Sequence, residues 1–273
     1  MKRLSLLLLL LLGACGKKQE DAWLGYGEGD NAFISAPQPG WVTRMRVERG
    51  TSVHRGDLLF VLDDVRERGG RDQAVGALAQ ARASLAQERS NLVYAQTELN
   101  RQDRLARDSA GTPTARDLAR TNYQQSEARI SQLEAQIVQM EASLATADYS
   151  LSQRAVVAQT EGPVQDIYFR EGEYVPASTP VISILPPKNI FVRFFVPESQ
   201  LSRVHLGQTV KISCDGCGAP VEAKVSFIAQ QEEFTPPVIF SIDNREKLVF
   251  KLEARAPGGL KINPGQPVDV RPL

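Results

Sequence analysis

The stretch EGPVQDIYFREGEYV, residues 161–175, repeats a pattern already present in PGWVTRMRVERGTSV, residues 39–53. An offset of 122 residues brings identical residues into register. These pairs are Ala36 and Ala158, Gly40 and Gly162, Val42 and Val164, Gly50 and Gly172, and Val53 and Val175. Apolar runs follow both copies, at residues 58–62 and 180–184. One small motif therefore occurs twice in the sequence, and residues 64–154 lie between the two copies.

Each copy has the pattern of short β-strands separated by turns at Gly50 and Gly172. A half of about thirty residues buries no apolar face by itself, so we expect the two halves to pair in one β-sandwich. The expected halves are residues 31–63 and 155–187.

Residues 64–154 have the pattern of a helical hairpin. Residues 72–107 and 115–154 are rich in Ala, Gln, Glu and Arg, and their apolar residues follow a heptad repeat. The first segment carries Leu78, Leu85, Leu92 and Leu99, and the second carries Tyr123, Ser126, Ile130, Leu133, Ile137, Met140, Leu144, Ala147 and Leu151. The turn DSAGTP, with Pro113 near the first turn of the returning helix, makes the two helices antiparallel. A compact bundle needs further apolar helices, so we expect a projecting hairpin with helices about 50–60 Å long.

Residues 188–273 change to a β pattern. Short apolar runs stand at residues 190–196, 210–213, 222–228, 246–254 and 267–270, and one short helix is expected to end at Gly207. This pattern predicts a small β-barrel domain. Residues 15–30 read as a linker, and residues 21–33 as an extra strand leading into the first half of the sandwich.

The N-terminus has the pattern of an export signal. A basic start is followed by an apolar run, residues 4–12, which is too short to cross a bilayer. The end of this run, Leu12-Gly13-Ala14-Cys15, resembles a bacterial lipobox. That resemblance implies that residues 1–14 are removed and that Cys15 carries a lipid. The alternative is an ordinary signal peptide with a chance cysteine.

Cys214 and Cys217 form a CxxC motif after a strand-like run. Two thiolates supply half of a structural zinc site, and His54 and His205 lack ligand spacing. A thioredoxin-like centre needs the motif at the start of a helix. In an oxidising compartment a local disulfide across a turn is favoured, and metal or redox use stays open.

The split repeat resembles the biotinyl/lipoyl carrier module, which is built from two quasi-symmetric halves. A carrier holds a modified lysine in the hairpin between the halves, but this chain has no lysine between Gln19 and Pro187. A lipoyl-like module split by a coiled coil, after a lipobox, resembles instead the HlyD-type periplasmic adaptors, or membrane fusion proteins. The expected fold is therefore an elongated α+β chain: a lipoyl-like β-sandwich split by a long antiparallel coiled-coil hairpin, followed by a small β-barrel.

The hairpin tip resembles that of adaptors that dock onto TolC-like outer-membrane channels. Those adaptors show arginine, leucine, serine and an acidic residue at fixed spacing, matched here by Arg101, Leu105, Thr112 and Asp117. The resemblance implies that the first three contact the channel, while Asp117 is expected at the helix start, where an acidic group is favoured. Alternatively, these residues only cap and close the helical turn.

The barrel segments VRFFVPE, CDGC, EFTPPVIFS and PGQPVDV resemble the lipoprotein adaptors of ABC-type exporters. The resemblance implies three partners: an inner-membrane exporter, a TolC-like channel, and further copies of the chain in a ring. It places the chain in the periplasm, lipid-anchored to a membrane, with the inner membrane favoured.

Charge and motifs exclude other classes. The chain has 32 basic and 32 acidic residues, which does not favour nucleic acid. It carries no P-loop and no Ser/His/Asp arrangement, so neither an enzyme nor a cofactor or metal site is expected. A structural coiled-coil envelope lipoprotein remains the alternative to an efflux or secretion adaptor.

Overall fold

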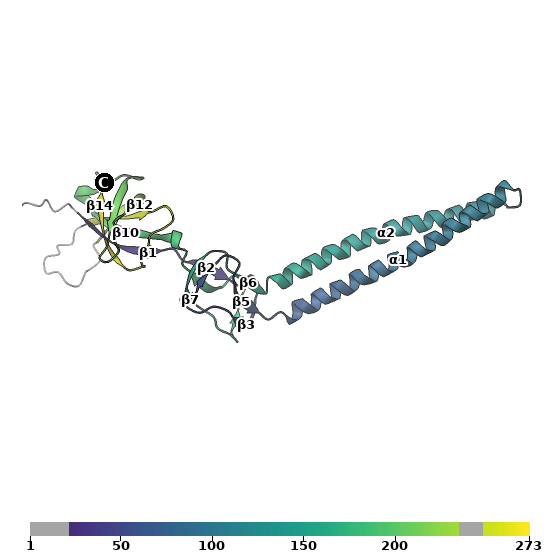
Figure 1. Ribbon diagram of the computed structural model, residues 1–273, viewed down its shortest axis with the longest axis horizontal. Coiled ribbons are helices and arrows are strands. Elements are labelled where there is room, and N and C mark those ends of the chain that lie inside the picture. The colour runs from purple at the N-terminus through teal and green to yellow at the C-terminus, as the bar shows by residue number, and fades with distance from the viewer. Residues whose placement is uncertain (1–21, 235–247) are drawn as a thin grey trace, which may run out of the picture.

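The computed structural model describes residues 22–234 and 248–273 of the chain. The molecule is elongated, with a β-barrel at one end, a β-sandwich in the middle and a two-helix hairpin at the other (Figure 1). From Trp23 onward, the chain leaves the barrel, crosses the sandwich, runs out and back along the hairpin, and returns through the sandwich to the barrel. This confirms the expected fold class.

The sandwich is made of two four-stranded sheets. The first half supplies β2 (Ala32–Ser35), β3 (Gly40–Met45), β4 (Ser52–Val53) and β5 (Leu58–Leu62), and the second supplies β6 (Ala155–Val157), β7 (Gly162–Ile167), β8 (Tyr174–Val175) and β9 (Pro180–Ile184). The strand orders are β2-β9-β7-β4 and β6-β5-β3-β8, so each sheet takes two strands from each half. Because neither sheet forms from one half alone, the apolar core between them exists only when the halves meet.

Backbone hydrogen bonds between the halves follow the sequence repeat. The amide of Gly50 donates to the carbonyl of Val164, and its counterpart Gly172 donates to Val42, both at 2.8 Å. A second such couple joins Gly56 to Ala158 and Ser178 to Ala36, again at 2.8 Å. The two halves are therefore related by an approximate twofold rotation that is visible in the sequence as the 122-residue offset.

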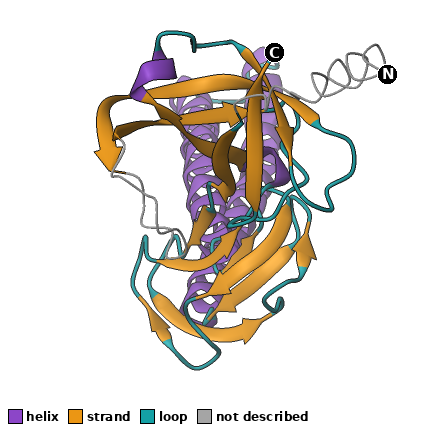
Figure 2. Ribbon diagram, turned by 90° about the vertical axis from the view of Figure 1, so that its left-hand side faces the viewer, coloured by secondary structure: helices purple, strands orange, loops and turns teal. Residues whose placement is uncertain are grey.

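The hairpin consists of α1 (Val65–Arg107) and α2 (Pro113–Ser152). Every heptad position named from the sequence is buried or half-buried, and Leu78, Leu85 and Leu133 are buried. The helices therefore pack along the predicted seam. Viewed along the molecule's long axis, the two helices lie behind the sandwich and the barrel (Figure 2).

The barrel is closed by six strands in the order β1-β10-β13-β12-β11-β14. They are β1 (Trp23–Gly29), β10 (Ile190–Pro197), β11 (Thr209–Ser213), β12 (Val221–Phe234), β13 (Leu248–Arg255) and β14 (Pro267–Pro272). A short 3-10 helix, η1 (Pro187–Asn189), leads from the sandwich into β10. Each apolar run that predicted a strand after residue 188 forms one.

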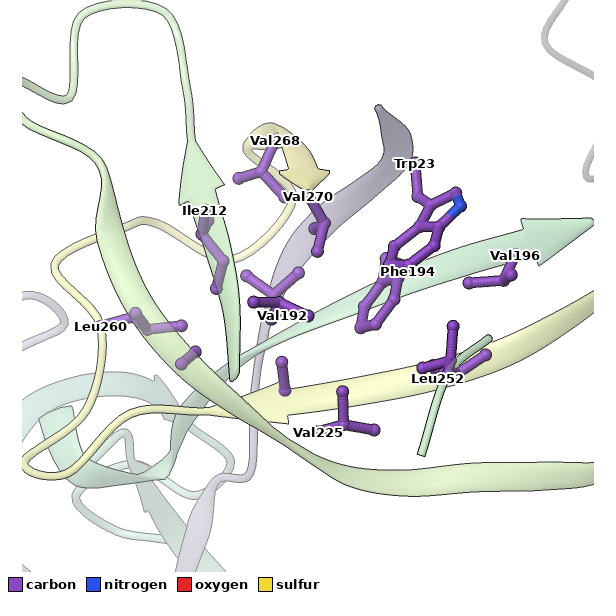
Figure 3. Packing of buried hydrophobic residues seen from close by; sticks show 14 of the residues in the cluster. Trp23, Val192, Phe194, Val196, Ile212, Val225, Leu252, Leu260, Val268 and Val270 are labelled. Atoms are coloured by element: carbon purple, nitrogen blue, oxygen red, sulfur yellow. The ribbon is translucent and has the colours of Figure 1, made fainter. Parts of the chain in front are cut away.

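The N-terminal strand differs from the expectation. Residues 21–33 were expected to lead into the sandwich, but β1 lies between β10 and β14 and closes the barrel, and only β2 joins the sandwich. Trp23 is buried and stacks on Phe194, with ring centroids 5.7 Å apart (Figure 3). The barrel core therefore depends on a residue more than one hundred positions away in sequence.

The expected helix up to Gly207 is also shorter, since α3 covers only Glu198–Leu201. The amides of Arg203 and Val204 donate to carbonyls three residues earlier, which tightens the chain into a turn. This turn directs Val204 into the barrel core, where it is buried. The burial of Val204 therefore ends the helix before Gly207, the residue at which the sequence predicted its end.

Within residues 22–234 and 248–273, no helix combines the length and the apolar character needed to cross a bilayer.

Candidate functional site

The hairpin tip lies at the end of the molecule farthest from the barrel (Figure 1). Residues 108–112 connect the helices. The amide of Ala110 donates to the carbonyl of Leu105 at 2.9 Å, and Ser109 adopts a left-handed conformation with φ of 55°. These contacts occupy carbonyls that the last turn of α1 leaves free, so the tip is a closed, compact turn.

Thr112 begins the returning helix. Its side-chain oxygen accepts a hydrogen bond from the amide of Ala115 at 3.2 Å, and Pro113 follows in the first helical position. This is the arrangement that threonine and proline favour at a helix start. Capping therefore uses the hydroxyl oxygen as an acceptor, and the hydroxyl proton is left for a partner.

Arg101 lies on α1, one turn before Leu105, with its side chain 62% exposed. Its guanidinium contacts the carboxylate of Glu98 at 2.6 Å. Hydrogen bonds from Arg101 and Gln102 lower the pKa of Glu98, so the carboxylate stays charged at neutral pH. Glu98 thus holds the exposed guanidinium close to the helix surface.

Leu105 is partly exposed and packs beside the turn. A Cβ atom on Gly111 would lie 3.1 Å from the Cβ of Leu105 and 3.1 Å from the amide nitrogen of Ala106. Gly111 therefore permits the turn to close tightly against this leucine. Because Arg101 and Leu105 are four residues apart on one helix, they lie on the same face.

Asp117 is not at the helix start. The returning helix begins at Pro113 instead of near Ala115, so its first turn contains no acidic residue and Asp117 lies in the second turn. Its carboxylate is exposed and lies 3.6 Å from the guanidinium of Arg116. The prediction was wrong because Thr112 and Pro113 start the helix earlier.

Sequence reasoning missed Leu118, which is 61% exposed near the tip. Its neighbour Ala119 is buried and lies in the seam. A leucine one position away from a seam residue points outside the helix pair, and that spacing was available in the sequence. Near its tip, the hairpin therefore presents two exposed leucines, Leu105 on α1 and Leu118 on α2.

The structure pairs Cys214 with Cys217 as a disulfide across the turn between β11 and β12. Both side chains pack against the barrel core, and the side-chain amide of Gln266 donates to the sulfur of Cys217 at 3.0 Å. The pair thus links this turn to the segment before β14. In the part of the chain that the structure describes, no group of three or more His, Cys, Asp or Glu residues is placed to hold a metal ion.

Cys15, the predicted lipid-attachment residue, lies outside the described residues, as do most of the residues of the EFTPPVIFS motif.

No protein-family model matches the chain. Among curated proteins, it is similar to a UPF0194 membrane protein of Yersinia pseudotuberculosis serotype IB (strain PB1/+), with 27% identity over 93% of this chain and 91% of the relative. It is also similar to the UPF0194 membrane protein YbhG of Salmonella arizonae, with 25% identity over 86% of this chain and 83% of the relative.

Among solved structures, the chain is similar to MacA from Actinobacillus actinomycetemcomitans, with a TM-score of 0.71 at 18% identity over 93% of this chain and 78% of the other. It is also similar to the membrane fusion protein Spr0693 from Streptococcus pneumoniae R6, with a TM-score of 0.56 at 16% identity over 93% and 98% of the two chains. The periplasmic adaptor protein EmrA has a TM-score of 0.52 at 14% identity over 92% and 99%.

Proposed function

The chain has the fold of the membrane fusion proteins, and from this premise we propose that it is the periplasmic adaptor subunit of a tripartite efflux or secretion system. It would bridge an inner-membrane exporter, of the ABC type, to a TolC-like outer-membrane channel. It performs no catalytic step in this proposal and needs no cofactor. The observation that carries the proposal is the direction of the hairpin, which projects away from the barrel and ends in an exposed tip (Figure 1).

The reach of the molecule supports a bridging role. The 43 residues of α1 make a helix about 65 Å long at 1.5 Å per residue. The first strand, β1, starts at Trp23. If Cys15 carries the lipid, the residues between this anchor and β1 span at most about 30 Å when fully extended. The barrel would then lie near the anchored membrane, and the tip would lie far from it.

The tip supports a contact with a helical channel. Arg101 offers an exposed guanidinium, Leu105 offers a partly exposed apolar surface, and Thr112 keeps a hydroxyl proton that can be donated. Charge-assisted hydrogen bonds and apolar knobs are the usual means by which helix ends recognise other helices.

We propose further that the adaptor acts as a ring of several copies. One pair of helices encloses no passage, so a sealed conduit requires hairpins side by side. Each copy would then place one Arg101 against the channel. A substitution of Arg101 would therefore weaken every one of these contacts around the ring.

The test is the charge reversal Arg101→Asp. Removing one partner of a hydrogen-bonded charged contact costs about 2–5 kcal/mol, so export of the system's substrate should fall strongly while the exporter still co-purifies. Site-specific photo-crosslinking from Leu105 to the channel should be lost. The matched control is Arg129→Asp, which reverses the charge of an exposed arginine of α2 whose guanidinium donates a hydrogen bond to Gln132. This variant should export like the parent.

An export rate equal to that of the parent in Arg101→Asp, with the channel still crosslinked at the tip, would place the contact elsewhere. Unchanged export in a strain that lacks the whole chain would instead favour a structural coiled-coil envelope lipoprotein.

A further inference from the structure

Arg154 lies at the point where the hairpin joins the sandwich, between the end of α2 and the start of β6. Arg154 is only 8% exposed, and an arginine is rarely so buried unless its charge is paired. One guanidinium nitrogen, Nη2, lies 2.5 Å from Oε1 of Glu67, and the other, Nη1, donates to the carbonyl of Pro39 at 2.8 Å. Its own carbonyl accepts from the amide of Leu62 at 2.8 Å.

These three contacts join four segments of the chain. Glu67 belongs to the first turn of α1, Pro39 precedes β3, and Leu62 ends β5. Arg154 itself is the second residue after the end of α2. One residue, through its side chain and its backbone carbonyl, therefore holds the bases of both helices against the edge of the sandwich.

The Arg154–Glu67 pair differs from the other ion pairs of the hairpin. Its side chains are 10% and 11% exposed, whereas those of the interhelical pair Arg89–Glu134 are 62% and 51% exposed. A pair shielded from water is screened little by salt, and removing either partner leaves the other charge buried and unpaired. The buried pair is therefore the one that fixes a geometry.

Gly40 leaves the space that the guanidinium occupies. A Cβ atom at this position would lie 2.7 Å from Nη1 of Arg154. The repeat-related Gly162 is crowded by a different group, since its Cβ atom would lie 2.4 Å from the carbonyl oxygen of Leu185. The same glycine of the repeat thus makes room for the hairpin joint in one half and for the exit to the barrel in the other.

We propose that Arg154 is a positioning residue that fixes the direction in which the hairpin leaves the sandwich. The hairpin acts as a lever: at a length of about 60 Å, a tilt of about 10° at the base displaces the tip by about 10 Å, roughly the diameter of a helix. The consequence of such a displacement for the channel rests on the function proposed above. The joint itself does not, and it is measured on the isolated chain.

The experiment measures distance distributions between spin labels by pulsed electron resonance. The full chain carries Cys15→Ser, so that the disulfide-bonded Cys214 and Cys217 are the remaining native cysteines and take no label. One label pair, Gln87→Cys with Arg55→Cys, reports the hairpin against the sandwich. The other, Gln87→Cys with Ala110→Cys, lies within the hairpin and its tip. All three labelled positions are exposed.

Three variants disturb the joint in different ways. Arg154→Met removes the guanidinium and keeps an apolar stem, Glu67→Gln removes the partner charge, and Gly40→Ala displaces the guanidinium without changing any charge. The matched controls are Arg89→Met, which breaks the exposed pair with Glu134, and Gly76→Ala, whose added Cβ atom meets nothing within 4 Å.

We expect each of the three variants to broaden the hairpin-to-sandwich distribution about twofold and to leave the distribution within the hairpin unchanged. The controls should match the parent. An unchanged hairpin-to-sandwich width in folded Gly40→Ala and Glu67→Gln would overturn the proposal, whatever the stability of Arg154→Met. Broadening of both distributions would also overturn it, because the hairpin itself would then be loosened.

Discussion

At the scale of single residues, the approximate twofold of the sandwich shows which backbone conformations the fold demands. Gly56 and Ser178 occupy equivalent turns and donate equivalent hydrogen bonds, and both have positive φ, at 95° and 62°. Only the first is a glycine. Serine in the left-handed region carries a steric cost that glycine does not. The second half therefore keeps a local strain that the first half avoids.

Ser178→Gly should raise the stability of the protein. The change relieves the left-handed strain but adds freedom to the unfolded chain, so we expect a net gain of about 0.5–1 kcal/mol in the free energy of unfolding. Ser178 is exposed and its side chain makes no hydrogen bond in the structure described here, so no contact is lost. The measurement is denaturant unfolding followed by circular dichroism.

The reciprocal change Gly56→Ser is the control for this prediction, because it introduces the same strain in the equivalent turn. It should lower stability. Equal stability of both variants and the parent would mean that the positive φ carries no cost at these turns.

At the scale of elements, the hairpin contains two kinds of interhelical contact. The apolar seam includes Leu133, which is 5% exposed, and beside it runs a ladder of exposed ion pairs. These pairs are Arg71 with Asp148, Arg82 with Glu141 and Arg89 with Glu134. Exposed ion pairs contribute little to stability because water screens them. Burial of a leucine contributes more, because it removes apolar surface from water. We infer that the seam stabilises the hairpin and that the ladder mainly favours one register of the helices.

Leu133→Ala should destabilise the hairpin by about 2–5 kcal/mol, the usual range for a large-to-small change at a buried site. Amide hydrogen exchange over residues 113–152 is the measurement, since it reports local opening of α2. Glu134→Gln breaks the neighbouring exposed pair and should change the exchange rates far less. Equal protection loss in the two variants would contradict the assignment of stability to the seam.

At the scale of the whole molecule, the chain is arranged as nested insertions. The hairpin is inserted into the sequence of the sandwich, and the sandwich is inserted into the sequence of the barrel. The first strand of the barrel, β1, precedes the sandwich, and its other strands, β10 to β14, follow it. Strands β5 and β6, which flank the hairpin, are antiparallel neighbours, with Val61 opposite Ala155. The sandwich therefore already holds together the two points from which the hairpin leaves.

Replacing residues 64–153 by a short Asn-Gly turn should leave the sandwich and barrel folded, because two antiparallel neighbours accept a tight connection. Near-ultraviolet circular dichroism from Trp23, which lies in the barrel core, is the measurement, and a cooperative thermal transition should persist. Deleting residues 22–29 is the contrasting case: it removes β1 together with Trp23 and leaves a gap between β10 and β14. Its readout is therefore thermal unfolding followed by far-ultraviolet circular dichroism, in which the cooperative transition of the barrel should be lost. A short-turn variant that fails to fold would show that the hairpin is needed by the sandwich.

The sequence by itself determined the parts that depend on local periodicity. The 122-residue repeat predicted the paired halves of the sandwich, the heptads predicted the two helices and their seam, and the apolar runs after residue 188 predicted the barrel strands. Periodicity reveals these because an element buries the face that its own repeat makes apolar.

Only the tertiary structure decided which distant segments meet. It brought Trp23 of β1 beside Phe194, and it made Arg154 contact both Glu67 and Pro39. At the tip, it assigned the helix start to Thr112 and left Asp117 in the second turn. The physical reason is that such contacts are set by the closing of a barrel, the burial of a charge and the satisfaction of free amides. None of these three effects produces a periodic pattern of residues in the sequence.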